Sequence, residues 1–228
     1  MAGSTGSYGS FCPVSKAAEV VCQRWTPLIL RELLVGSTRF NEIHRGIPTC
    51  SPSLLSKRLK ELEVAGVVDH DPETATYALT EAGSELLPVI QGLGEWGQRW
   101  ARSEYRADEL NPDTLLWDVR RYLRPGGLGA DRVVVLFEFP AMPPRKRFYW
   151  VVDDGREVDV CLTDPRMDVD VEISADLRAL TRIWMGDQPF GDAVRQGLID
   201  VRGPRRYVSE VPGWFGQHPI LSKVASAR

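Results

Sequence analysis

The sequence lacks any long hydrophobic run and any segment typical of a secretory signal. Its longest uninterrupted aliphatic or aromatic stretch is VVVLF at residues 133–137, whereas a helix that spans a bilayer needs roughly 20 apolar residues. The first ten residues, MAGSTGSYGS, are small and polar. We therefore expect a cytoplasmic protein without a membrane partner, and a flexible tail over residues 1–11.

The sequence also lacks the patterns that hold metals or perform catalysis. Its four cysteines and three histidines show no metal-ligand spacing, so we expect free thiols, no metal and no cofactor. It contains no G-x-S-x-G motif and no acid pair with a histidine base. GLGEWG at residues 92–97 matches G-x-G-x-x-G, but the segment before it has a helical pattern, whereas a nucleotide site requires a strand there. We therefore do not expect an enzyme.

The net charge is only −3, so composition alone gives no argument for a nucleic-acid partner. The charge is, however, unevenly distributed along the chain. Residues 16–60 contain eight basic and three acidic residues, whereas residues 61–105 contain two basic and nine acidic ones. A basic face can therefore exist on an acidic protein.

The hydrophobic periodicity changes from helical to strand-like along the chain. Helical spacing dominates up to about residue 105, interrupted by two short predicted strands at residues 67–70 and 76–79. Period-2 alternation follows after residue 131, and MDVDVEIS at residues 167–174 indicates an antiparallel sheet with one buried face. We expect an α+β protein with three parts after the tail: a domain over residues 12–105, a linking helix and loop over 106–130, and a second domain over 131–228.

One predicted helix, SPSLLSKRLKELEVAG at residues 51–66, has an apolar side and a polar side. Ser51 suits the N-cap, Pro52 the first turn and Gly66 the end. Leucines at helical spacing form the side that packs, while serines and lysines on the opposite side are suitable donors to phosphates and base edges. That polar side comprises Ser53, Ser56, Lys57 and Lys60, with Arg58 at its edge. A solvated amphipathic helix is the alternative interpretation of this pattern alone.

The order of the elements favours a helix whose polar side contacts DNA. A short helix, a tight turn at Pro48, a second helix and a two-stranded ribbon form the winged-helix order. The stretch from Cys12 to about Trp100 resembles the HxlR-type winged-helix transcription regulators, relatives of the MarR group. The matching segments are CPV (12–14), RWTPLILRELL (24–34), RFNEI (39–43), SPSLLSKRLKELEVAGVV (51–68), YALTEAG (77–83) and LLPVI…WG (86–97).

The resemblance implies a homodimer that binds double-stranded DNA and represses or activates transcription. It also implies that the helix from Ser51 enters the major groove and that Arg39 lies near the DNA backbone. The wing departs from the family pattern. Its tip, DHDPETA at residues 69–75, has three acidic residues and no lysine or arginine, which puts a phosphate contact in doubt. A set of apolar residues recurs at near-heptad spacing: Leu86, Ile90, Leu93 and Trp100. They form either a dimer seam or part of the chain's own core, and the sequence leaves both alternatives open.

Cys12 aligns with a cysteine that senses oxidants or electrophiles in some members of this family. Modification of a thiolate near a dimer interface would shift the DNA-bound state. Of the neighbouring residues, only Lys16, one helical turn further on, is placed to lower the pKa of this thiol. An unreactive structural cysteine is the alternative.

The C-terminal half resembles the sterol-carrier-protein-type-2-like fold. The resemblance rests on residues 159–204, where strands, helices, a G-D turn and a G-P pair follow in that fold's order. It implies an apolar tunnel and a hydrophobic ligand, and the dense aromatic residues suit a ligand cavity as well as a plain core. We expect Trp150 to point inward together with Phe148 and Val152. The predicted lining residues are Phe137, Trp150, Trp184 and Met185.

Three functional hypotheses follow. The first is a dimeric DNA-binding regulator modulated by a hydrophobic small molecule in the C-terminal domain. The second is a redox-sensing regulator that acts through Cys12. The third is a lipid carrier or accessory module whose winged helix mediates protein contacts. For the first two, the candidate DNA-binding residues are Arg39, Ser51, Ser53, Ser56, Lys57, Arg58 and Lys60.

Overall fold

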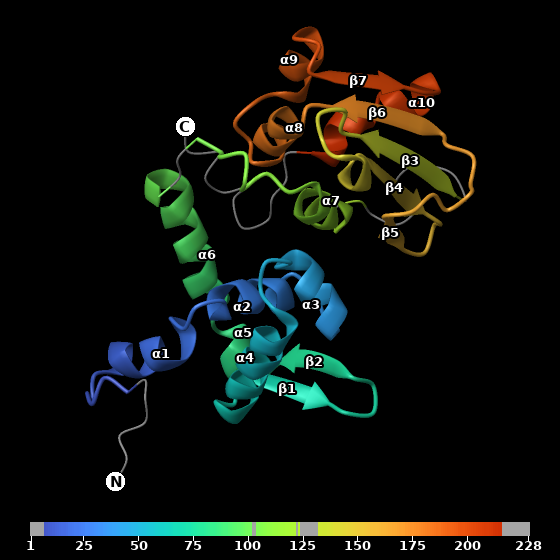
Figure 1. The fold of residues 1–228 in the computed structure, drawn as a ribbon. Helices are drawn as coiled ribbons and strands as arrows, with labels where there is room; N and C mark the ends of the chain where they lie inside the picture. Colours follow the sequence, from blue (N-terminus) through green and yellow to red (C-terminus); the bar gives the residue numbers. More distant parts are fainter. Residues whose placement is uncertain (1–6, 102–103, 122, 124–131, 216–228) are drawn as a thin grey trace. The chain divides into compact units, whose positions relative to one another are not determined.

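A computed structural model shows the chain as two compact units, residues 1–94 and residues 95–228 (Figure 1). The residues that the structure describes are 7–101, 104–121, 123 and 132–215. Each unit has its own hydrophobic core. The units are therefore described separately.

The first unit has the predicted winged-helix order of elements. Its described elements are α1 (Pro13–Val21), α2 (Thr26–Leu34), α3 (Phe40–Gly46), α4 (Pro52–Val64), β1 (Val68–Asp71), β2 (Thr76–Leu79), α5 (Glu81–Ser84) and α6 (Leu87–Trp96), the last of which runs across the division between the units. The strands β1 and β2 pair antiparallel, with Val68 opposite Leu79. Their ribbon extends beyond the helices in Figure 1. This hairpin is the wing that the sequence predicts.

The core of the first unit is built from one side of each helix. Its buried apolar side chains come mainly from α2, α3 and α4: Ile29, Leu30, Leu33, Ile43, Leu55, Leu59 and Leu62. Burial of each such side chain contributes on the order of 1.5–3 kcal/mol to folding. The three α4 leucines therefore fix which side of that helix faces solvent.

A buried charge joins α2 to α3 within this core. The Glu32 side chain is fully buried, and the Arg31 guanidinium donates to its carboxylate over 2.6 Å. Arg31 also donates to the Gly46 carbonyl over 3.0 Å. A Cβ at Gly46 would overlap with the Glu32 carboxylate. Only glycine therefore permits this close approach of the two helices.

The second unit is a five-stranded sheet with helices on one of its faces. Its described elements are a π-helix (Gly97–Ala101), α7 (Pro112–Arg120), β3 (Val133–Glu138), a 3₁₀ turn (Pro144–Lys146), β4 (Phe148–Asp153), β5 (Val158–Cys161), β6 (Val171–Ala175), α8 (Leu177–Trp184), α9 (Phe190–Arg195), β7 (Ile199–Arg202), α10 (Arg205–Val208) and a second 3₁₀ turn (Val211–Trp214). The core joins side chains of the helices to one face of the sheet.

The sheet is mixed, which corrects the prediction of an antiparallel sheet. The strand order is β5-β4-β3-β6-β7, and β3 and β6 pair in parallel, with Phe137 opposite Ile173. The other three pairs are antiparallel. Alternation along a strand shows that one face is buried. This is commoner in antiparallel sheets, but it does not fix the direction of each neighbouring strand. The sequence pattern therefore predicted the buried face of β6 but not its partner's direction.

The prediction that Trp150 points inward with Phe148 and Val152 is wrong. Tyr149, Val151 and Asp153 are the buried residues of β4, whereas Phe148 is exposed and Trp150 and Val152 are partly exposed. Both alternating sets of β4 are mainly apolar, so the strand's own sequence does not choose between its faces. The Tyr149 hydroxyl donates to Asp113 at the start of α7 over 2.6 Å, which places the helices over the Tyr149 face.

Candidate nucleic-acid interface

The helix α4 begins and ends where the sequence predicts. Ser51 is the N-cap, and its hydroxyl accepts a hydrogen bond from the backbone N–H of Leu54 over 3.4 Å. Pro52 occupies the first turn. Gly66 follows the helix with a φ of 71°, a left-handed conformation that favours glycine. These local signals position the polar side of the helix.

The polar side of α4 is exposed along its length. Ser53, Ser56, Lys57 and Lys60 are all exposed, opposite the buried leucines. Lys57 lies 3.9 Å from Glu61, and Lys60 pairs with Glu63 over 3.0 Å. Such exposed pairs are worth less than about 1 kcal/mol, so phosphates can compete for both lysines. These four side chains, together with the exposed Ser51, are defined here as the α4 polar face.

Arg58 does not belong to this face, although the sequence placed it at the edge. Its side chain is 16% exposed and turns toward α1 and α2. The Arg58 Nε donates to the Arg24 carbonyl over 3.2 Å, and its guanidinium pairs with Glu61. Trp25, next in the chain, has a φ of 78°, a strained value for a bulky residue. Arg58 therefore holds α4 against the turn between α1 and α2. Neither this role nor the strained turn has a signal in the sequence.

Arg39 lies at the start of α3 and beside the wing. It is exposed, and its backbone pairs with Thr76 of β2. Its backbone N–H also donates to the Glu42 carboxylate over 3.1 Å, which closes the first turn of α3. The structure thus brings Arg39 to the junction of α3 and the wing, where its side chain is accessible.

The wing tip carries three acidic residues. Asp69, Asp71 and Glu73 are exposed. The Thr74 hydroxyl and the Glu73 backbone N–H donate to the Asp71 carboxylate over 2.7 and 2.9 Å, and these hydrogen bonds lower the pKa of Asp71. The Asp71 carboxylate is therefore ionised at neutral pH and repels phosphates.

Cys12 precedes α1 and is partly exposed. Hydrogen bonds from the backbone N–H groups of Ser15 and Val14 lower the pKa of its thiol. The sequence offered Lys16 as the only neighbour that would do so, but Lys16 pairs with Glu19. Ser7 and Tyr8 also bond to Glu19, so these two residues of the expected flexible tail are held to α1. Residues 1–6 lie outside the described part.

The predicted dimer seam separates into two sets. Ile90 is buried in the core of the first unit and Leu86 packs against that core, so both serve the chain's own packing. Leu93 and Trp100 are 54% and 70% exposed. Val89 and Trp96 are also exposed, and Val89, Leu93 and Trp96 recur at helical spacing on α6. The exposed apolar stripe therefore keeps Leu93 of the predicted seam and adds Val89 and Trp96.

The four predicted ligand-lining residues do not share one side of the sheet. Phe137 and Trp184 are buried in the core of the second unit, and Met185 packs against that core. Trp150 lies on the other face, because it pairs with Leu136 while Phe137 pairs with the buried Tyr149. A single cavity lined by all four residues is therefore excluded. This prediction failed because both alternating sets of β4 are mainly apolar, so its sequence did not show that Trp150 lies on the other face.

Two further features concern the described residues only. Within them, no helix is both long and apolar enough to cross a membrane. The same residues contain no group of three or more histidines, cysteines or acids arranged to hold a metal ion.

Comparison with known proteins places the first unit in a family. The model of HxlR-like helix-turn-helix proteins matches residues 20–105. YvaP of Bacillus subtilis (strain 168), described as an uncharacterized HTH-type transcriptional regulator, is 43% identical over 95 residues, which are 39% of this chain and 88% of that protein. The chain belongs to the HxlR-like helix-turn-helix family. A second relative, the HTH-type regulator Rv3095 of Mycobacterium tuberculosis (strain ATCC 25618 / H37Rv), is 41% identical over 92 residues, 38% of this chain and 58% of that protein.

One solved structure similar to the chain is quinone-bound YodB from B. subtilis. It is 37% identical, with a TM-score of 0.36, and the match covers 39% of this chain and 99% of that one. The family match ends at residue 105. The five-stranded sheet therefore lies outside the part of the chain that the family model covers.

Proposed function

We propose that the chain is a dimeric transcription regulator that binds double-stranded DNA through the α4 polar face. The observation that carries the proposal is the exposure of Ser53, Ser56, Lys57 and Lys60 on one side of α4, opposite its buried leucines. Family membership supports the same conclusion, since the curated relatives are named HTH-type transcriptional regulators.

The chemistry of each side chain determines whether it contacts phosphates or bases. The two lysines neutralise phosphates and release counterions, which provides affinity that depends on salt. The serines at the N-terminal half of α4 are short enough to reach base edges in the major groove. Arg39 contacts the DNA backbone next to the wing. The acidic wing tip contributes no attraction, so α4 carries most of the binding.

Dimerisation is proposed through the exposed apolar stripe of α6. A patch that includes Val89, Leu93 and Trp96 is unfavourable in water, and a second copy would cover it. Two copies would present two α4 helices to two half-sites about one DNA turn, roughly 34 Å, apart. Replacement of Leu93 by Glu should convert the dimer to a monomer and abolish binding to a two-half-site duplex. Sedimentation analysis measures the first effect directly.

The second unit is proposed as a sterol-carrier-like module that binds a hydrophobic effector. Of the four predicted lining residues, Phe137, Trp184 and Met185 lie on the covered side of the sheet, in or against the core of the second unit. Phe190 stacks on Phe215 at 5.7 Å beside the same core. Trp150 is withdrawn from the set. Quenching of tryptophan fluorescence by a long-chain fatty acid, reduced by Met185→Glu, tests the module.

A redox response through Cys12 is the second candidate function. The specific observation is the lowered pKa of a partly exposed thiol, which increases the thiolate fraction. Diamide should weaken DNA binding by the wild-type protein and leave Cys12→Ser unaffected. Equal responses of the two proteins would exclude this candidate.

The main proposal is tested with a duplex from the DNA upstream of the chain's own gene. Fluorescence anisotropy should show binding that weakens steeply with salt, and the Lys57→Ala plus Lys60→Ala variant should lose about 10–100-fold in affinity. Lys16→Ala, a lysine on α1, is the matched control and should bind normally. An intact dimer that binds no DNA at low salt would leave the accessory-module hypothesis, in which the winged helix contacts protein.

A further inference from the structure

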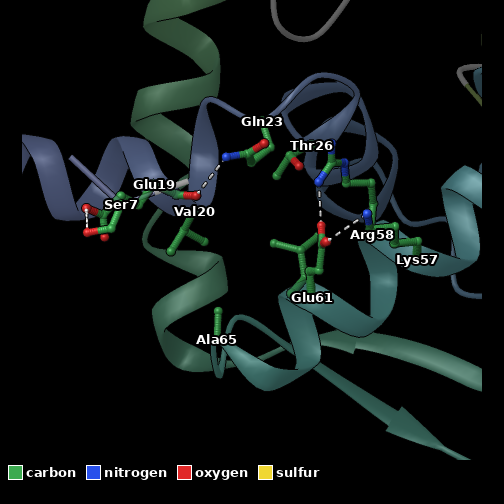
Figure 2. A pocket seen from close by; sticks show the side chains of 10 residues that line it. Ser7, Glu19, Val20, Gln23, Thr26, Lys57, Arg58, Glu61 and Ala65 are labelled. Carbon is green, nitrogen blue, oxygen red and sulfur yellow. Dashed lines mark hydrogen bonds and ion pairs between the residues drawn. The ribbon is translucent and has the colours of Figure 1, made fainter. Parts of the chain in front are cut away.

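A cavity of about 380 Å³ lies among α1, the turn after it, and α4 (Figure 2). It belongs entirely to the first unit. Its volume falls within the usual range for small-molecule sites, roughly 300–1,000 Å³. The lining residues are Ser7, Glu19, Val20, Gln23, Thr26, Lys57, Arg58, Glu61, Leu62 and Ala65.

The charges of the lining are balanced. Glu19 lies on the α1 side, whereas Lys57, Arg58 and Glu61 lie on the α4 side (Figure 2). The Tyr8 backbone N–H and the Ser7 hydroxyl donate to Glu19 over 2.8 and 3.0 Å, and they lower the pKa of its carboxyl. Glu19 is therefore ionised at neutral pH, and Lys16 pairs with one of its oxygens over 3.4 Å. The α4 side of the cavity holds two cations and one carboxylate, Glu61.

The α4 side retains donors that protein contacts do not saturate. Glu61 pairs with Arg58 and lies 3.9 Å from Lys57, so one carboxylate faces two cations. Lys57 is 67% exposed and has three N–H donors. A ligand anion can therefore bind here without displacing Glu61.

A hydroxyl group also lines the cavity. Thr26 is 2% exposed and lines the cavity. A threonine hydroxyl can donate one hydrogen bond and accept others, so it is a suitable donor to a ligand carboxylate. Val20, Leu62 and Ala65 provide an apolar wall beside it.

We propose that this cavity binds a small zwitterion of the amino-acid type. The ligand's ammonium group pairs with Glu19, its carboxylate with Lys57 and the Thr26 hydroxyl, and its side chain lies on the apolar wall. A ligand with both charges matches a lining with two acids and two bases, whereas a simple anion or cation would meet a like charge at one end.

The cavity shares Lys57 with the α4 polar face, so a bound ligand would weaken DNA binding. This consequence rests on the proposed DNA-binding function. A carboxylate on Lys57 neutralises a charge that a phosphate would otherwise use. By linkage, ligand and DNA must weaken each other by the same factor. The site thus gives the winged-helix unit an effector of its own, separate from the sheet unit.

The test uses three probes of matched shape on the full chain: phenylalanine, 3-phenylpropanoate and 2-phenylethylamine. Isothermal titration calorimetry without DNA should show phenylalanine binding about tenfold more tightly than either singly charged probe. Failure of phenylalanine to bind, or equal binding of the three, would overturn the ligand assignment. This measurement is independent of the DNA-binding proposal.

Two variants and a control locate the site. Glu19→Gln should remove the preference for phenylalanine over 3-phenylpropanoate, and Thr26→Val should weaken phenylalanine several-fold. Glu63→Gln, a carboxylate of α4 outside the cavity, should leave phenylalanine binding unchanged. Equal effects of Glu19→Gln and Glu63→Gln would overturn the placement.

Competition is measured last, by anisotropy of the upstream duplex. Saturating phenylalanine should weaken DNA binding by a few-fold to tenfold in the wild type and by less in Glu19→Gln. Normal DNA binding that phenylalanine does not change would overturn the antagonism. Absence of DNA binding, with phenylalanine still bound, would instead contradict the proposed function and leave the ligand site standing.

Discussion

The helix α4 and the strand β4 differ in how completely their sequences determine the buried side. In α4, leucines occupy one side and serines and lysines the other, so only one orientation keeps the charges in water. In β4, Tyr149 and Val151 alternate with Phe148, Trp150 and Val152, and burial of either set would be favourable. An amphipathic pattern therefore predicts a surface only where its second side is polar.

The buried face of β4 is chosen by partners far away in the chain. Tyr149 contacts Asp113 of α7 and packs edge-on against Phe139 at 5.8 Å. Neither contact is visible in the local pattern. The largest expected effect follows from this choice of face.

Tyr149→Ala should destabilise the protein by about 3–5 kcal/mol, because it opens a cavity in the core. Trp150→Ala should cost about 1 kcal/mol, since that side chain is already partly in water. Urea denaturation of both variants measures the difference. A larger loss in Trp150→Ala would restore the original prediction for β4.

Gly46→Ala sharpens the comparison inside the first unit, where the local pattern was informative. The new methyl group would meet the buried Glu32 carboxylate, and we expect a loss of about 2–4 kcal/mol. Gly92→Ala is the control, because a Cβ at that helical position meets nothing within 4 Å. It should be neutral or slightly stabilising. Similar melting temperatures for the two variants would contradict the close packing of α2 and α3.

The contribution of Tyr149 to stability should depend on alkaline pH. Burial, followed by the hydrogen bond to Asp113, raises the pKa of Tyr149 above its ordinary value near 10. The unfolded chain therefore loses this proton first, and stability present below pH 10 falls by up to about 1.4 kcal/mol for each pH unit above it. Tyr149→Phe should show a smaller decline between pH 10 and 11. An unchanged slope in denaturation at these pH values would count against the assignment.

The wing is the part of the DNA-binding unit where the expected effect is smallest. Asp69→Asn plus Asp71→Asn removes two charges from the tip, and DNA affinity should rise about two- to tenfold at low salt. The gain should vanish at high salt, because screening is then complete. Anisotropy at two salt concentrations measures it. A loss of affinity would mean that the wing acids assist binding.

The sequence was informative where local chemistry determines the outcome. The cap of α4 at Ser51 and the end of the helix at Gly66 agree with it, because serine, proline and glycine act within one turn. The parallel pairing of β3 with β6 and the inward turn of Arg58 depend on residues distant in the chain. The same holds for the cavity: Thr26 and Glu19 have no motif that marks them. The winged-helix family, by contrast, was predicted from motifs alone, and the comparisons confirm it.

The central claim is that Lys60 contacts phosphate whereas Arg58 is structural. It is tested most directly by the slope of log affinity against log salt for the upstream duplex. For a dimer that uses two copies of each residue, Lys60→Ala should reduce the slope by about 2. Arg58→Ala should leave the slope unchanged while lowering thermal stability. A reduced slope in Arg58→Ala, with an unchanged slope in Lys60→Ala, would contradict the account.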